Sequence, residues 1–135
     1  MLKFILYIIS LIKDPKTYKW AGVGLLALAG DYGLYNYLLG IIGMDLAKLC
    51  ATFVGVNISF NLNRIWTFKS NGTFFEDLKR YMALYLVAII VNVSVNNLAF
   101  RILEDIDLAY IAALFVSVII GYFGQRLLVF KNRTN

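Results

Sequence analysis

The sequence contains no histidine, one cysteine, one proline and few charged residues. A single cysteine, Cys50, excludes an intramolecular disulfide, and without histidine beside it a typical zinc site cannot be built. We therefore interpret Cys50 as a packing residue and expect neither a metal nor a cofactor. Only 16% of the residues are charged, which is too few to cover the surface of a soluble domain of this length.

Apolar residues dominate what is present. They make up 61% of the 135 residues, and the mean hydropathy is +0.73. Four segments approach the roughly 20 apolar residues needed to cross a bilayer. They are residues 20–43, 46–66, 81–100 and 108–126. The sequence thus predicts an all-α membrane protein whose four transmembrane helices form one domain over residues 17–135.

Residues 1–16 form a separate N-terminal segment. The apolar run between Lys3 and Lys13 is too short to span a membrane. A cleaved signal peptide would need small residues after such a run, whereas charged residues and Pro15 follow it here. We favour an amphipathic helix lying in the membrane interface, with a signal peptide as the alternative.

Basic residues predict the orientation. Most of them fall on one side of the four-span arrangement, against Lys48 and Arg101 on the other. That side holds Lys3, Lys13, Lys16, Lys19, Arg64, Lys69, Lys79, Arg80, Arg126, Lys131 and Arg133. Both termini are therefore expected in the cytoplasm, with Lys48 extending towards the outer headgroups. The net charge of +5 is interpreted as contact with anionic membrane lipids, and nothing else in the sequence supports nucleic-acid binding.

The second predicted span ends in a group of polar residues. On a helix, Asn57, Asn61 and Arg64 fall at i, i+4 and i+7 and share one face. The opposite face carries the small residues Ala51, Gly55 and Ser59, whose spacing favours close packing against another helix. The guanidinium of Arg64 suits bidentate binding of a phosphate. Simple contact with lipid headgroups is the alternative.

Asp31 is the one charged residue within the first predicted span, near the bilayer midplane. Such a residue is costly in hydrocarbon and is expected to be paired or functional. Asn92 and Asn96 share a face of the third span, and amides both donate and accept hydrogen bonds, as binding of sugar hydroxyls requires. A structural role is the alternative: hydrogen bonds from Asn57 or Asn92 to Asp31, and amide contacts between helices.

The chain contains a candidate internal repeat. Residues 64–69 resemble residues 126–131 at an offset of 62, with arginine, phenylalanine and lysine coinciding. Each half would then be a two-helix hairpin, and the two hairpins would be parallel repeats. The alternative is that this pattern is common at any cytoplasmic helix end.

These residues resemble the GtrA-like family. The resemblance covers residues 18–131 and rests on the glycine-rich first span with Asp31, the run Asn63-Arg64-Ile65-Trp66-Thr67-Phe68, and the Gln125-Arg126 ending of the fourth span. It implies translocation of a polyprenyl-phosphate-linked sugar across the cytoplasmic membrane for modification of a surface polysaccharide. It also implies a polyprenyl-phosphate glycosyltransferase as a neighbour.

The resemblance and the residues together give our functional prediction. We expect Arg64, Arg126, Asn63 and Gln125 to bind the lipid phosphate, and the sugar to follow Asp31, Asn57, Asn61, Asn92 and Asn96. No catalytic constellation is present and the chain has no room for a nucleotide-binding domain, so enzyme activity is not expected. Four short helices hardly enclose a sugar, which favours a homo-oligomer or a complex with the glycosyltransferase. The alternatives are a non-transporting anchor for that enzyme and a small multidrug-type exporter.

Overall fold

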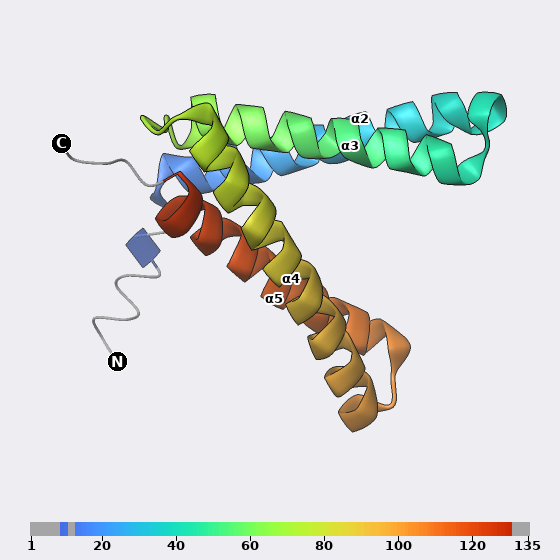
Figure 1. Cartoon of the computed structure of the whole chain (residues 1–135). Coiled ribbons are helices and arrows are strands. Elements are labelled where there is room, and N and C mark those ends of the chain that lie inside the picture. The colour runs from blue at the N-terminus through green and yellow to red at the C-terminus, as the bar shows by residue number, and fades with distance from the viewer. Residues whose placement is uncertain (1–8, 11–12, 131–135) are drawn as a thin grey trace. The chain divides into compact units, whose positions relative to one another are not determined.

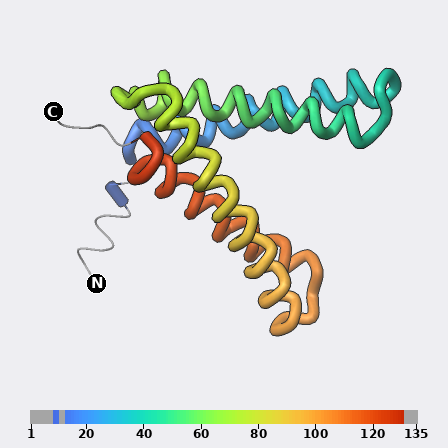
Figure 2. The backbone as a smooth tube through the Cα atoms, in the orientation of Figure 1, coloured from blue at the N-terminus to red at the C-terminus, as the bar shows by residue number. Residues whose placement is uncertain are grey.

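The computed structural model describes residues 9–10 and 13–130, and the regular secondary structure of this part of the chain is all helical, with no strand. It forms two compact units, Met1–Lys69 and Ser70–Asn135. Each unit is a helical hairpin of two long antiparallel helices lying side by side (Figures 1 and 2). The predicted all-helical membrane fold is thus confirmed at this level. The interfacial helix expected over residues 1–16 lies largely outside the described residues.

The first unit consists of α2 (Pro15–Ile42), α3 (Met44–Leu62) and a π-helical turn, η1 (Asn63–Thr67). The side chain of Asp14 caps α2 by accepting a hydrogen bond from the backbone N–H of Lys16 at 2.9 Å. Pro15 follows as the first helical residue, where its missing N–H is not needed. The helix accordingly begins earlier than the expected residue 20.

Small residues hold α2 and α3 together. Ala47, Ala51 and Gly55 are buried at four-residue spacing along α3. A Cβ atom on Gly55 would lie 3.1 Å from the backbone oxygen of Ala27 on α2, so the two backbones approach closely at this point. Gly43 alone joins the helices, with φ of 82°, a backbone conformation that favours glycine.

The second unit consists of α4 (Phe74–Leu103), α5 (Ile106–Gly124) and a second π-helical turn, η2 (Gln125–Val129). Thr73 caps α4 by accepting from the backbone N–H of Glu76 at 3.4 Å. Asp105 caps α5 in the same way through the N–H of Leu108 at 2.9 Å. Residues 74–80, which precede the expected third span at residues 81–100, are therefore the first turns of α4. Their acidic residues suit a helix N-terminus.

Buried positions correspond between the two units at an offset of 62. Alanine is buried at both members of two such pairs, and aromatic or amide side chains are buried in three more. The pairs are Ala47 and Ala109, Ala51 and Ala113, Phe60 and Tyr122, Asn63 and Gln125, and Phe68 and Phe130. Within each hairpin, the second helix therefore packs on the first through an equivalent face: that of α3 in the first unit and that of α5 in the second.

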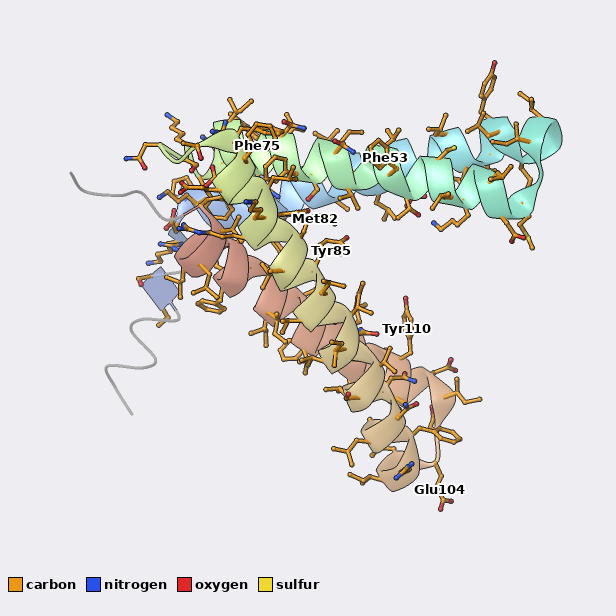
Figure 3. All side chains as sticks on the ribbon, viewed as in Figure 1. Phe53, Phe75, Met82, Tyr85, Glu104 and Tyr110 are labelled. Atoms are coloured by element: carbon orange, nitrogen blue, oxygen red, sulfur yellow. The ribbon has the colours of Figure 1, made fainter. Side chains whose placement is uncertain are left out.

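Three helices have the length and apolar composition to cross a membrane: Pro15–Ile42, Phe74–Leu103 and Ile106–Val129. Large apolar side chains cover their outer surfaces, as Figure 3 shows for Phe75 and Tyr110, which are 72% and 64% exposed. Such surfaces fit a lipid environment, and the protein is a multi-pass membrane protein. The expected second span, residues 46–66, corresponds to α3 and η1 and is not among the three, because Lys48 and several amides lower its hydropathy.

Candidate functional site

Asp31 and Lys48 form an ion pair between α2 and α3. The Nζ of Lys48 lies 3.0 Å from Oδ1 and 3.3 Å from Oδ2 of Asp31. The hydroxyl of Thr52, one turn further along α3, lies 3.5 Å from Oδ2 and can donate a third, longer hydrogen bond. The carboxylate is thus held by two side chains of the facing helix.

The position of this pair explains why it forms. Asp31 lies about 24 Å along α2 from Pro15 and about 17 Å from Ile42, near the middle of the helix. A charged group at such depth needs a partner of opposite charge. Lys48, which we expected to extend outwards to headgroups, instead lies along α3 towards Asp31, with its Nζ also 5.8 Å from the centre of the Tyr35 ring. Lys48, Thr52 and Tyr35 were not among the predicted site residues.

Asn57 and Asn61 do not reach Asp31. The Nδ2 of Asn57 donates to the backbone oxygen of Phe53 at 2.8 Å, and that of Asn61 donates to the oxygen of Asn57 at 2.9 Å. Each amide therefore uses one hydrogen on its own helix, away from the face of Gly55 that packs on α2. The suggested hydrogen bond from Asn57 to Asp31 is wrong; Lys48 and Thr52 take that place.

The first predicted phosphate-binding pair, Asn63 and Arg64, lies in the π-helical turn η1. The backbone N–H of Phe68 donates to the oxygen of Asn63 at 2.8 Å, an i to i+5 bond that closes the wider turn. The Asn63 side chain is buried and donates to the hydroxyl of Ser59 at 3.3 Å, while Arg64 is half-buried. The turn forms the C-terminal end of α3, a place where π-turns occur.

Gln125 and Arg126 occupy the equivalent turn, η2. The N–H of Phe130 donates to the oxygen of Gln125 at 2.8 Å, and Gln125 is buried as Asn63 is. Arg126 is half-buried, and its Nη1 donates to the hydroxyl of Tyr122 at 2.6 Å. Both predicted arginines therefore follow a buried amide at the start of a π-helical turn. Sequence patterns gave no signal for these turns.

Asn92 joins α4 to α5. Its Nδ2 donates to the hydroxyl of Ser117 at 2.8 Å, and that hydroxyl donates to the backbone oxygen of Ala113 at 2.9 Å. This arrangement fits the structural alternative for Asn92, a contact between helices. Asn96 lies one turn further along α4 and is half-buried.

Asp31 and Asn92 occupy corresponding places in their hairpins. Ser117 lies 62 residues after Gly55. A Cβ atom on Gly55 would lie 3.1 Å from the Cβ of Asp31, and Ser117 bonds directly to Asn92. In each hairpin, one polar side chain of the first helix thus lies against the equivalent position of the second helix. Of these two polar side chains, Asp31 is charged and Asn92 is neutral.

Asp77 is a buried polar residue that sequence reasoning missed. It is 1% exposed in the first turns of α4, and the hydroxyl of Ser70 donates to its Oδ2 at 2.8 Å. The backbone N–H of Gly72 in turn donates to the Ser70 hydroxyl at 3.2 Å. The spacing of Thr73 and Glu76, typical of a capping box, was the signal that a helix begins here. The group orders the start of α4.

The described residues contain no group of three or more histidine, cysteine, aspartate or glutamate side chains that could hold a metal ion. The charged groups at the places considered above are two guanidinium groups at π-helical turns and one ammonium–carboxylate pair between helices. Guanidinium and ammonium groups bind phosphate, and carboxylates and amides bind hydroxyls. The arrangement is suited to binding a polar, anionic ligand.

Comparison with known proteins identifies one family. The model described as GtrA/DPMS, transmembrane domain, matches residues 19–134. Searches of curated proteins and of solved structures gave no significant match.

Proposed function

Because the chain belongs to the GtrA/DPMS transmembrane domain family, we propose that it moves a polyprenyl-phosphate-linked sugar across the cytoplasmic membrane for surface polysaccharide glycosylation. Members of this family are generally non-catalytic membrane proteins that take part in handling lipid-linked sugars. Translocation is a step that a non-catalytic membrane protein of this kind can supply.

The proposal includes four membrane crossings with both termini in the cytoplasm. α3 runs antiparallel to α2 along its length, so it returns the chain to the side from which α2 entered. Pairing with Asp31 reduces the cost of placing Lys48 in hydrocarbon. The matching buried positions and π-helical turns support two parallel hairpin repeats, each ending on the cytoplasmic side where basic residues gather.

The single observation that carries the proposal is the placement of Arg64 and Arg126. Each follows a buried amide, Asn63 or Gln125, at the start of a π-helical turn at the basic end of its hairpin. A guanidinium held there at the headgroup level can bind a lipid phosphate through two parallel hydrogen bonds. We propose that each turn can contact a lipid phosphate.

We propose that the sugar then passes polar side chains deeper in the hairpins. Asp31, Asn92 and Asn96 lie along the first helices of their hairpins, and Asn57 and Asn61 lie along α3. Their carboxylate and amide groups can exchange hydrogen bonds with sugar hydroxyls in turn. The prenyl tail remains in lipid. Enclosing this path calls for a second copy of the chain or a partner such as the glycosyltransferase.

The Asp31–Lys48 ion pair argues against the multidrug-exporter alternative. Such an exporter needs an acidic residue in its first helix that is available to a cationic substrate. Here the carboxylate of Asp31 is already engaged by the Lys48 ammonium at 3.0 Å.

Reconstitution into liposomes tests the proposal. Polyprenyl phosphate carrying one glucose would be incorporated on one side, and exposure of glucose on the other side would be followed with a membrane-impermeant oxidant. Protein-containing liposomes should expose the sugar faster than protein-free liposomes. Equal rates would contradict translocation. If the chain also retained the glycosyltransferase in membranes, equal rates would favour the anchor function instead.

A further inference from the structure

Lys48 and Arg64 are the two basic residues between Met44 and Thr67. They lie near opposite ends of α3 and η1, roughly 24 Å apart along the helix axis. The hydrocarbon core of a bilayer is about 30 Å thick. A phosphate that leaves Arg64 therefore meets Lys48 as the next cation along this helix.

We propose that Lys48 is a second contact for the lipid phosphate, at the end of α3 opposite Arg64, and that the headgroup opens the Asp31–Lys48 ion pair on arrival. This inference rests on the proposed function and adds a residue and a step to it. Lys48 then binds the phosphate, while Asp31 binds hydroxyls of the sugar.

The exposure of the pair fits this role. The side chain of Lys48 is 59% exposed and that of Asp31 is 20% exposed, so the ammonium is accessible while the carboxylate lies deeper. A lysine near a helix end normally extends to the headgroups. Lys48 is instead held along the hairpin by Asp31, where its exposed side chain can meet a ligand at the surface of the helix pair.

The chemistry of the pair matches the headgroup. A sugar phosphate presents one anionic group and several hydroxyl donors, and the pair presents one cation with three hydrogens and one carboxylate acceptor. The exchange pairs the ammonium of Lys48 with the phosphate and leaves the carboxylate of Asp31 hydrogen-bonded to sugar hydroxyls. Thr52, 3.5 Å from Asp31, remains in place as a further donor to the carboxylate.

At the corresponding place, the described residues of the second unit form no ion pair. The corresponding place there holds the neutral pair of Asn92 and Ser117, and the position that matches Lys48 is Tyr110. Phosphate binding away from the arginines is therefore assigned to the first unit alone.

The test uses the double variant Asp31→Asn with Lys48→Gln, which removes both charges together and keeps groups that can hydrogen-bond. Lys79→Gln on the exposed surface of α4 is the matched control for loss of one positive charge. The full-length proteins would be placed in nanodiscs, and binding of sugar-free polyprenyl monophosphate would be measured in a background of Arg64→Gln with Arg126→Gln, which removes both arginine contacts.

In that background, binding should weaken by a further factor of about ten in the double variant, as expected for loss of one hydrogen bond to a charged group. The control should leave binding unchanged. Unchanged binding in the double variant would overturn the inference. If the double variant failed to fold, Lys48→Met would replace it, and Lys48→Arg, which keeps the charge, should restore binding.

Translocation of polyprenyl-phosphate glucose separates the two proposals. If the wild type binds the monophosphate through Lys48 but moves no sugar, the proposed function fails and the binding site stands. If the wild type moves the sugar and the double variant moves it equally fast, the inference fails and the function stands.

Discussion

The Nη1 of Arg126 donates a hydrogen bond to the hydroxyl of Tyr122 at 2.6 Å, one turn earlier on the same helix, and its guanidinium carbon lies 5.8 Å from the centre of the tyrosine ring. Tyr122 is buried, so it holds the arginine in one orientation. The corresponding residue of the first unit, Phe60, has no hydroxyl. The hydroxyl contact that Arg126 makes with Tyr122 therefore cannot form between Arg64 and Phe60.

Replacing Tyr122 by phenylalanine should lower the free energy of unfolding by about 1 kcal/mol, the net value of a typical hydrogen bond. Thermal unfolding of the purified protein in detergent would measure this. Tyr110→Phe, on an exposed part of the same helix, is the control and should have no effect. Equal stability of the two variants would show that the Arg126 contact contributes nothing.

Arg64→Lys should reduce translocation of the lipid-linked sugar by about tenfold, because a lysine keeps the charge but cannot form the paired hydrogen bonds of a guanidinium. The liposome assay measures this directly. Arg80→Lys, exposed near the start of α4, serves as the control and should transport normally. Full activity of Arg64→Lys would leave Arg64 with headgroup contact alone.

Gly55→Ala should destabilise the first unit by about 1–3 kcal/mol, because the added Cβ would press on the backbone oxygen of Ala27 at 3.1 Å. Gly24→Ala is the control. No atom lies within 4 Å of a Cβ placed there, and alanine favours a helix by about 1 kcal/mol over glycine. In thermal unfolding, Gly55→Ala should therefore be the least stable protein, the wild type intermediate and Gly24→Ala the most stable. Any other order of stability would contradict the packing argument.

Cysteine labelling tests the orientation. In a Cys50→Ser background, Asn71→Cys and Arg133→Cys should resist an impermeant thiol reagent added to intact cells, because we propose that the basic ends of both hairpins face the cytoplasm. Asp107→Cys, exposed in the first turn of α5, should be labelled. The reverse pattern would invert the topology and move Arg64 to the outer side.

The helical membrane fold could be predicted from sequence because it depends on long apolar runs. Helix ends were less accurate: α4 begins at Phe74 because Thr73 caps it, whereas the apolar run placed the start of this span at residue 81 and left out Glu76 and Asp77. The acidic residues that lower hydropathy there also stabilise the first turn of a helix. Composition and capping thus gave opposite indications, and capping was the correct one.

The candidate site was predictable only in part. Polar residues within apolar spans identified Asp31 and Asn92, but their partners, Lys48 and Ser117, depend on how the paired helices are aligned along their axes. Periodicity within one helix does not determine that alignment. The π-helical turns were also missed, since the i to i+5 bond that defines them has no residue pattern of its own.

The connections along the chain have a consequence for engineering. Gly43 alone joins the helices of the first hairpin, Glu104 and Asp105 join those of the second, and residues 68–73 connect one unit to the other. A gene divided between Lys69 and Ser70 would therefore encode two fragments that each keep a whole hairpin, its caps and its terminal turn. Coexpressed fragments taken from two relatives with different sugars would form chimaeras, and these would assign sugar preference to one hairpin or the other.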